Sequence, residues 1–304
     1  MKTRIIVGSR GSKLALRQTD LVLDRLKSFY PEIACQVRVI KTTGDRDLKS
    51  VLDEIGGQGV FVKELEAALL SGEIDMAIHS LKDMPSELDM DFKLAAVCMR
   101  TDARDAFISS SGLPLAQLPL GASIATGSLR RAAQLRQCRP DIAISPVRGN
   151  VDTRLRKLNA GEFDGIIIAA AALARLGWQD RITEYLPIQD FLPAPGQGAL
   201  AVETRAYDTD LNPCLEVINE EPLWQSITAE RAFLRTFGAG CRIPVAAFAT
   251  VQAGNLRIKG MAASIDGTTM LRDFREGPAP DAERIGRILA ESLLGLGARE
   301  LIHG

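Results

Sequence analysis

The first part of the chain alternates between short apolar runs and longer stretches with helical spacing. The runs 4–9, 36–42 and 74–80 have the length and composition of strands. The stretches 12–29 and 60–72 instead repeat apolar residues at the spacing of an amphipathic helix. Strands that alternate with helices are typical of parallel βαβ units, so we expect an α/β unit here.

A second α/β unit is expected to begin near residue 104. Its predicted strands and helices alternate through 121–126, 128–138, 142–150, 151–161 and 164–177. The apolar run 166–174 indicates a buried strand that continues into a helix, and it is too short to span a bilayer. A Pro/Gly-rich segment and another apolar strand follow in 192–205, where the chain can return across a domain boundary.

The remaining residues have a different pattern. Helices are predicted at 223–237 and 281–297, and strand runs separated by the turn sequences AGN and DGT fill 245–277. This pattern favours a small α+β domain. The polar, glycine-bearing segment 42–59 of the first unit is expected to be a mobile loop.

The charge balance is ordinary, but the choice of basic residue is not. The formal net charge of the 304 residues is -1, so no global field favours nucleic acid or a membrane. Of the 37 basic residues, 27 are arginine and 10 are lysine, and seven of the arginines lie in 130–156. Because arginine binds carboxylates and phosphates bidentately, this excess favours an anionic ligand.

Cysteines and histidines are few. The five cysteines are an odd number with no C-x-x-C pair, and no signal peptide begins the sequence, so we expect a cytoplasmic protein. With only His79 and His303 present, a Ser-His-Asp triad or a histidine metal site has few candidates, and no metal is expected.

Two predicted strand ends carry hydroxyl and arginine side chains at the start of a helix. The first sequence, GSRGS, supplies Arg10 and Ser12. The second, ATGSLRR, supplies Thr126, Ser128 and the pair 130–131. Ligands of open α/β sheets bind at the carboxyl ends of strands, and helix N-termini attract anions, so the two ends could form an anion clamp. Alternatively, both serines are ordinary helix caps and the arginines are solvated.

The sequence AIHSLKDMP, residues 77–85, places Ser80, Lys82 and Asp83 directly after a strand. A carboxylate among cations could stabilise a positive intermediate or transfer a proton. The alternative is that Lys82 and Asp83 are ordinary turn residues. For His79, which points to the opposite face from Ser80, we expect packing in a core.

Cys241 lies in a glycine-bracketed loop, GAGCRIPVA, after a predicted helix. Gly238 and Gly240 would allow a partner to approach closely. A lone cysteine is more often structural than reactive, so the residues alone indicate a presented thiol that could serve as a covalent attachment point.

These segments together resemble the porphobilinogen deaminase family over essentially the whole chain. The motifs that carry the resemblance are GSRGSKLAL, GVFVKELEAALL, DMAIHSLKDMP, RDAF, GSLRRAAQL, RGNVDTRLRKL, LPAPGQGALAVE and ERAFLRTFGAGCRIPVA. The resemblance implies a transferase of tetrapyrrole, haem-type, biosynthesis. Such an enzyme condenses four porphobilinogen molecules with loss of ammonia and releases hydroxymethylbilane.

The resemblance also assigns roles to individual residues. One dipyrromethane cofactor per chain would be held by Cys241 through a thioether, and Asp83 would be the catalytic carboxylate. Cofactor-binding positions would be Lys82, Asp83, Thr126, Ser128, Arg130 and Arg131. Positions that bind porphobilinogen and the growing polypyrrole chain would be Arg10, Ser12, Ser80, Arg148, Arg154 and Arg175. Gln58 departs from the family, in which lysine is common, and this puts the role of the loop 42–59 in doubt.

The fold implied by the resemblance is α/β. It has two periplasmic-binding-protein-like lobes with mixed, mostly parallel sheets, and a small α+β C-terminal domain that carries the cofactor cysteine. The expected boundaries are 1–98 with 199–216 for the first lobe, 104–192 for the second, and 220–304 for the last domain. A monomer is expected.

Two other functions use the same features. A binding protein without catalysis could use the two-lobed anion clamp, but it gives no reason for Cys241 or Asp83. A nucleic-acid binder could use the arginines of 130–156, but aromatic residues make up 5% of the chain and the net charge is balanced. We therefore expect neither a nucleic-acid nor a membrane partner.

Overall fold

The computed structural model describes residues 2–41, 62–238 and 243–303. The chain divides into unit 1, made of Met1–Thr101 and Gly198–Trp224, and unit 2, made of Asp102–Gln197 and Gln225–Gly304. The predicted loop 42–59, with Gln58, and Cys241 lie outside the described residues. The division into three domains stays a prediction.

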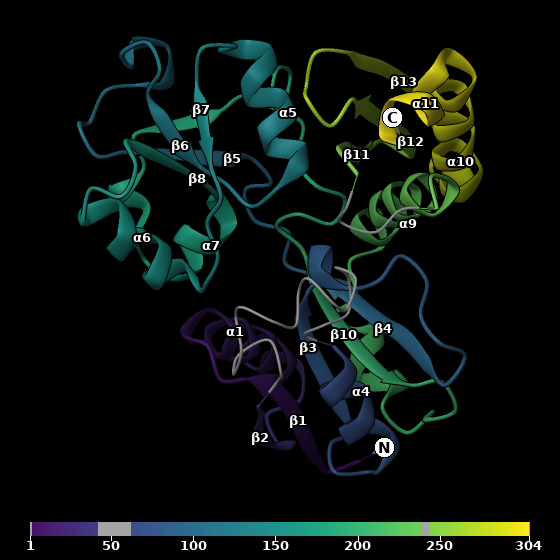
Figure 1. Cartoon of the computed structure of the whole chain (residues 1–304). Helices are drawn as coiled ribbons and strands as arrows, with labels where there is room; N and C mark the ends of the chain where they lie inside the picture. The colour runs from purple at the N-terminus through teal and green to yellow at the C-terminus, as the bar shows by residue number, and fades with distance from the viewer. Residues whose placement is uncertain (1, 42–61, 239–242, 304) are drawn as a thin grey trace. The chain divides into compact units, whose positions relative to one another are not determined.

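Unit 1 is built on one five-stranded sheet in the order β2-β1-β3-β10-β4 (Figure 1). Its strands are β1 (Arg4–Arg10), β2 (Ala34–Ile40), β3 (Met76–Ser80), β4 (Phe92–Cys98) and β10 (Leu200–Arg205). Its helices are α1 (Lys13–Phe29), α4 (Lys63–Leu70), α8 (Asn212–Glu216) and the short 3-10 turn η1 (Leu81–Asp83). The strand predicted within 192–205 is β10, and it pairs antiparallel with both β3 and β4.

The first part of unit 2 is a second five-stranded sheet, in the order β7-β6-β8-β5-β9. Its strands are β5 (Asp105–Ser109), β6 (Ser123–Ala125), β7 (Ala143–Ser145), β8 (Gly165–Ala169) and β9 (Glu184–Leu186). Its helices are α5 (Leu129–Cys138), α6 (Val151–Asn159) and α7 (Ala170–Arg175), with 3-10 turns η2 (Leu115–Gln117) and η3 (Gln179–Arg181). The run 166–174 is a buried strand continued by a helix, as predicted.

The two five-stranded sheets share one topology. In each, the strand at the fourth place in the order runs antiparallel to both its neighbours, and the other pairings are parallel. The reversed strands are β10 and β5, and each follows a place where the chain passes from one unit to the other. The prediction of α/β sheets that are mixed and mostly parallel is confirmed.

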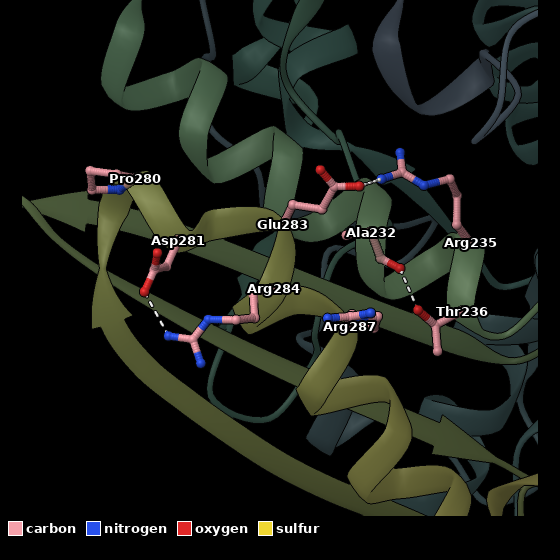
Figure 2. A pocket seen from close by; sticks show the side chains of 8 residues that line it. All are labelled: Ala232, Arg235, Thr236, Pro280, Asp281, Glu283, Arg284 and Arg287. Carbon is pink, nitrogen blue, oxygen red and sulfur yellow. Dashed lines mark hydrogen bonds and ion pairs between the residues drawn. The ribbon is translucent and has the colours of Figure 1, made fainter.

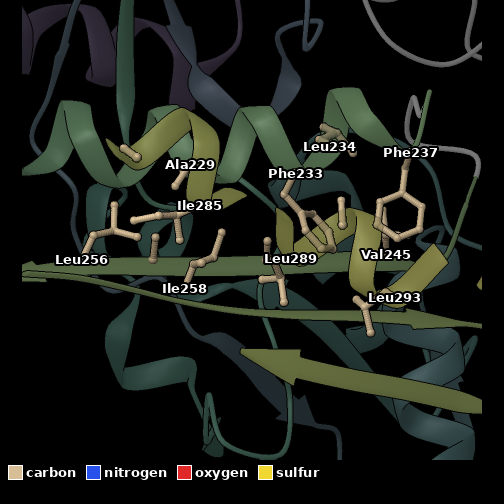
Figure 3. Close-up of a cluster of buried hydrophobic side chains, with 14 of the residues drawn as sticks. Ala229, Phe233, Leu234, Phe237, Val245, Leu256, Ile258, Ile285, Leu289 and Leu293 are labelled. Carbon is tan, nitrogen blue, oxygen red and sulfur yellow. The ribbon is translucent and has the colours of Figure 1, made fainter. Parts of the chain in front are cut away.

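The second part of unit 2 is a three-stranded antiparallel sheet packed against helices (Figure 3). Its elements are α9 (Glu221–Thr236), β11 (Val245–Gln252), β12 (Asn255–Ala263), β13 (Met270–Pro278), η4 (Ala279–Asp281), α10 (Ala282–Leu293), η5 (Leu294–Ala298) and α11 (Arg299–His303). Phe233 of α9 and Leu289 of α10 meet Ile258 of β12 in its buried core. The predicted small α+β architecture is therefore present here.

The helix predicted at 281–297 is interrupted. α10 ends at Leu293, and the chain continues through the π-helical turn η5 into α11. Gly297 within that turn has φ 98°, a left-handed conformation that glycine adopts without a steric penalty. The single predicted helix is therefore two helices, α10 and α11, joined by a turn with a left-handed glycine.

Candidate active site

The carboxyl ends of β1 and β3 meet at one edge of the unit 1 sheet, because these two strands are parallel neighbours. Arg10 ends β1, and Ser12 caps α1 by accepting the Ala15 N–H at 3.2 Å. Gln18 of α1 donates to the Ser80 hydroxyl at the end of β3, over 2.8 Å. The structure thus brings the predicted residues of unit 1 to one edge.

The turn η1 follows Ser80 directly and holds Lys82 and Asp83. It is anchored at both ends, because Leu81 N–H donates to Ala199 O at 3.1 Å and Met84 N–H donates to Leu81 O. The Leu81 side chain is buried, Lys82 is half-buried and Asp83 is exposed. A carboxylate therefore projects from a turn whose backbone is fixed by an adjacent strand.

The corresponding edge of the first unit 2 sheet lies beyond β6. Thr126 N–H donates to Ser145 O at 2.9 Å, and its hydroxyl accepts the Ser128 N–H at 3.2 Å. Ser128 caps α5 by accepting the Arg131 N–H. The hydroxyls of the motif are thus used within the turn and the cap, as the alternative interpretation of the serines requires.

The alternative interpretation also expects solvated arginines, and this does not hold for Arg130 and Arg131. Both are buried, with 5% and 6% of their surface exposed. Both contact Asp105, which begins β5 and is fully buried. Arg130 Nη1 lies 2.7 Å from Asp105 Oδ2, and Arg131 Nη2 lies 2.6 Å from Asp105 Oδ1. Burial opposes ionisation of Asp105, but attraction to the two guanidinium groups outweighs it and holds the pKa of this carboxyl far below its usual range.

The three remaining predicted arginines follow strands β7 and β8, which lie on either side of β6 in the sheet. Arg148 is exposed after β7, and Arg154 is half-buried in α6, where its Nε donates to Gly149 O at 2.7 Å. Arg175 is buried at the end of α7, which continues β8. β7, β6 and β8 are parallel neighbours, so Arg148 and Ser128 share one sheet edge.

The predicted residues fall into two sets by unit. Arg10, Ser12, Ser80, Lys82 and Asp83 belong to unit 1. Thr126, Ser128, Arg130, Arg131, Arg148, Arg154 and Arg175 belong to unit 2. Each set stands at its own sheet edge, and the predicted joint action of the two sets stays a prediction.

Sequence reasoning missed the buried carboxylates, and two of them lie beside residues that it singled out. Asp105 could have been suspected, because an acidic residue that opens the apolar run DAFIS must find a cation if it is buried. Glu203 lies within β10, and its Oε2 is 3.0 Å from His79 Nε2. His79 is buried as predicted, but it faces this acidic side chain as well as the core.

A separate hollow of ≈ 410 Å³ lies in unit 2 between the end of α9 and the start of α10 (Figure 2). Two ion pairs lie on its walls, one between α9 and α10 and one within the segment that begins α10. Arg235 bonds Glu283 at 2.8 Å, and Arg284 bonds Asp281 at 2.6 Å. None of the predicted site residues lines it, and this pattern is typical of a solvated surface with ion pairs.

Neither a metal centre nor a membrane-spanning helix is present over residues 2–41, 62–238 and 243–303. Within these ranges, no group of three or more His, Cys, Asp or Glu side chains is placed to hold a metal ion. No helix in the described part of the chain has the length and apolar character needed to cross a membrane.

Solved structures with a similar chain path are distant in sequence. A Bordetella pertussis BvgS VFT2 domain is 17% identical, with a TM-score of 0.44 over 75% of this chain and 92% of that one. A TRAP periplasmic solute binding protein from Desulfovibrio salexigens is 11% identical, with a TM-score of 0.41 over 72% of this chain and 73% of that one.

Relatives in sequence are far closer. Porphobilinogen deaminase of Syntrophus aciditrophicus (strain SB) is 47% identical over 98% of this chain and 97% of its own length. The enzyme of the same name from Geobacillus kaustophilus (strain HTA426) is 47% identical over 98% of this chain and 96% of its own. Residues 5–213 match the model of the porphobilinogen deaminase dipyromethane cofactor binding domain, and 224–295 match the porphobilinogen deaminase C-terminal domain. The chain belongs to the porphobilinogen deaminase family.

Proposed function

We propose that the protein is a hydroxymethylbilane synthase. It joins four porphobilinogen molecules, releases ammonia at each step, extends a covalently held dipyrromethane primer and frees hydroxymethylbilane for tetrapyrrole biosynthesis. The observation that carries this function is the match of both family domains, in order, to 5–213 and 224–295. The chemistry of the two sheet edges supports it, because a chain of pyrroles with acetate and propionate groups is a polyanion that arginines would bind.

The proposed catalytic carboxylate is Asp83. Loss of ammonia leaves a positive charge on the substrate, and a carboxylate held in a fixed place stabilises such a charge better than mobile water does. The anchored turn η1 supports this role, because the backbone hydrogen bonds of Leu81 and Met84, which flank Lys82 and Asp83, hold its two ends. Lys82 and Ser80, its neighbours in sequence, would bind carboxylates of the cofactor and the substrate.

The donor set at the start of α5 fits the carboxylates of a dipyrromethane. Arg130 and Arg131 carry two positive charges against the single carboxylate of Asp105, so the cluster is cationic overall. The positive end of the α5 dipole lies at the same place, with Ser128 and Thr126 in its turn. We propose that these four residues hold the cofactor, which when bound supplies the pyrrole carbon that accepts the first substrate.

The remaining arginines would hold the substrate and the lengthening chain. Arg10 and Ser12 would act from unit 1, and Arg148, Arg154 and Arg175 from unit 2. Each added pyrrole brings two more carboxylates, so several cationic contacts are needed rather than one. Cys241 would attach the cofactor, as the GAGCRIP sequence indicates.

Intact mass under denaturing conditions tests the attachment. The wild-type chain should be heavier than 32.9 kDa by two linked pyrroles, Cys241→Ser should lack the adduct, and Cys138→Ser, at an exposed thiol, should keep it. Purified wild type should also convert porphobilinogen to a linear tetrapyrrole. An unmodified chain that turns over normally would contradict the cofactor assignment, and an adduct without turnover would contradict the activity.

We also propose that the enzyme works in the cytoplasm, as a monomer and without nucleic acid. The four described cysteines are all free thiols, as in proteins from reducing compartments. The near-zero net charge gives no general attraction to nucleic acid. Light scattering of the holoenzyme and a salt-dependent gel shift would test the last two statements.

A further inference from the structure

Asp105 is the centre of a hydrogen-bond network inside unit 2. Its Oδ1 accepts from Arg131 Nε at 3.0 Å and from Arg131 Nη2 at 2.6 Å, and its Oδ2 accepts from Arg130 Nη1 at 2.7 Å. Both guanidinium groups also donate to backbone carbonyls, Arg130 to Leu192 O at 2.7 Å and Arg131 to Ile167 O at 3.0 Å. The planes of the two side chains are therefore held by fixed acceptors.

A glutamine from another part of the chain completes the shell of Asp105. Gln197 is fully buried, and its Nε2 donates to Asp105 Oδ1 at 3.0 Å and to Ala103 O at 2.8 Å. It thereby ties the segment before β10 to the segment that leads into β5. Because Gln197 is neutral, it adds a hydrogen bond to the carboxylate without changing the charge of the cluster.

The backbone that carries Gln197 is in turn held by Glu230 of α9. Glu230 is fully buried, and its Oε2 accepts the Gly196 N–H at 2.6 Å. Its Oε1 accepts the Ala249 N–H of β11 at 2.8 Å. Gly196 has φ 77°, a left-handed conformation that favours glycine, and its buried N–H needs an acceptor, which Glu230 provides. The network thus runs from α9 through residue 196 and Gln197 to Asp105 and the arginines.

We propose that Gln197 and Glu230 are positioning residues for Arg130 and Arg131. Neither would touch the ligand: Gln197 would fix the Asp105 carboxylate, and Glu230 would fix the turn that presents Gln197. Recognition of cofactor carboxylates by the arginine pair would then depend on α9, the helix that precedes Cys241 in the sequence. This inference rests on the proposed function for its effect on catalysis, but not for its geometry.

A competing explanation is that both residues only stabilise unit 2, as any buried polar group does. The two explanations differ in what happens to the arginines. A positioning role predicts that loss of Gln197 loosens the bond from Arg131 Nε to Asp105 in the folded protein. A stabilising role predicts a lower free energy of unfolding with that bond unchanged.

The test is the exchange with solvent of the Arg131 Nε–H, measured by NMR on the folded holoenzyme and assigned by its loss in Arg131→Lys. Gln197→Met keeps the side-chain length and removes both donations. Glu230→Gln keeps the side-chain shape, but its amide NH2 group would face the backbone N–H of Gly196 or of Ala249, so that one of these donors loses its acceptor. In each variant we expect exchange about tenfold faster or more, the effect of losing one buried bond of this kind.

Ile285→Val is the matched control, because it lies in the buried core of the same unit and outside the network. It should lower the stability of unit 2 and leave the exchange unchanged. Unchanged exchange in folded Gln197→Met, or equal acceleration in Ile285→Val, would overturn the inference, whatever the protein does with porphobilinogen.

A second measurement connects the network to the proposed function. In Gln197→Met the rate at which apoenzyme acquires its adduct from added hydroxymethylbilane should fall about tenfold or more, whereas Ile285→Val should react like the wild type. Faster exchange with a normal reaction rate would overturn the part of the inference that concerns cofactor recognition. Failure of the wild type itself to acquire an adduct would instead contradict the proposed function.

Discussion

Asp105 changes how the two neighbouring arginines of α5 can act. A guanidinium pair with no counter-charge would be expensive to bury, and each side chain is at least nine-tenths buried here. The Asp105 carboxylate lowers that cost while leaving one net positive charge. The site can therefore attract a carboxylate in the bound state without being unstable in the free state.

We predict that Asp105→Asn destabilises unit 2 in a pH-dependent way. Removing the charge leaves Arg130 and Arg131 buried without their counter-ion, which costs about 3–5 kcal/mol near neutral pH. Because the pKa of Asp105 is lowered on folding, its contribution is complete above the unfolded-state pKa of about 3.9 and is lost as the pH falls toward the folded-state value. The difference in the free energy of unfolding between wild type and Asp105→Asn should therefore shrink below about pH 4.

Urea unfolding measured from neutral to acidic pH checks this prediction. A Trp224→Phe background would leave Trp178 of unit 2 as the fluorescent reporter, because these are the two tryptophans of the chain. Asp164→Asn, at an exposed carboxyl of the same unit, serves as the comparison. If the difference in the free energy of unfolding between wild type and Asp105→Asn grows as the pH falls, the assigned charge state of Asp105 is wrong.

We predict that Asp83→Asn separates binding from chemistry. The variant should fold and keep a cofactor that is supplied as preformed tetrapyrrole, but kcat should fall about 100-fold or more, as when one main electrostatic stabiliser is lost. Asp83→Glu should retain more activity than Asn, because it keeps the charge. Steady-state tetrapyrrole formation at known cofactor content measures both, and Asp89→Asn, at an exposed acid of the same unit, is the control. Equal kcat for wild type and Asp83→Asn would remove Asp83 from the mechanism.

For single residues, the sequence predicted whether a side chain is buried better than it predicted which side chain lies beside it. His79 was expected in a core and is buried, but its neighbour Glu203 comes from a strand more than a hundred residues later. Asp105 and Arg131 are likewise far apart in sequence. Local spacing carries no information about such pairs, because they arise from the order of strands in a sheet.

Helices α9 and α10 approach each other closely at Gly286. A Cβ built there would lie 3.0 Å from the Cα of Ala229 and closer still to its carbonyl group. These are backbone atoms, which cannot move aside as the end of a flexible side chain can. Gly286 therefore sets the distance between the two helices that cover the three-stranded sheet (Figure 3).

We predict that Gly286→Ala destabilises this part of unit 2 by about 1–3 kcal/mol, the usual cost of overpacking. This is opposite to the gain of about 1 kcal/mol that alanine brings to an open helical position. Gly295→Ala is the matched control, since in the described part of the chain no atom beyond the neighbouring backbone of the same helical turn lies within 4 Å of a Cβ at residue 295. Urea unfolding followed by circular dichroism compares them. A Gly286→Ala protein as stable as the Gly295→Ala protein would show that the helices can separate at little cost.

Element prediction succeeded for the two helices that follow the predicted site motifs. The helix predicted at 12–29 is α1 and the helix at 128–138 is α5, each capped by a serine. The hydrophobic pattern did not predict β4, β5 or β9, which have seven, five and three residues. β6 and β7 have three residues each and lie within predicted ranges, so length alone does not decide which strands the pattern predicts. β5 is nevertheless the strand that supplies Asp105.

For the whole molecule, the α/β class and the small C-terminal sheet follow from the order of predicted elements, but the shared topology of the two larger sheets does not. The sequence has no internal repeat of fixed period that would predict this likeness. The likeness lies in the place of the reversed strands β5 and β10, each of which follows a passage between units. This likeness depends on the order in which the chain connects the strands, and the hydrophobic periodicity of a sequence carries no information about that order.

The last prediction concerns the stability of the whole enzyme with and without its cofactor. A ligand that binds the folded state alone stabilises it by about 2.7 kcal/mol at a hundredfold excess over Kd, and a tethered polyanion beside buried arginines should contribute at least that much. The adduct-free Cys241→Ser protein should therefore melt about 5 °C or more below wild type, since 1 kcal/mol shifts Tm by roughly 2–4 °C in a chain of this class.

Cys138→Ser changes the same atom at an exposed thiol and should melt like wild type. Scanning calorimetry of the three proteins, with cofactor content checked by mass, gives the comparison. If the Cys241→Ser protein melts with wild type while lacking the adduct, the cofactor does not neutralise the arginines, and the assignment of Arg130 and Arg131 to its carboxylates is wrong.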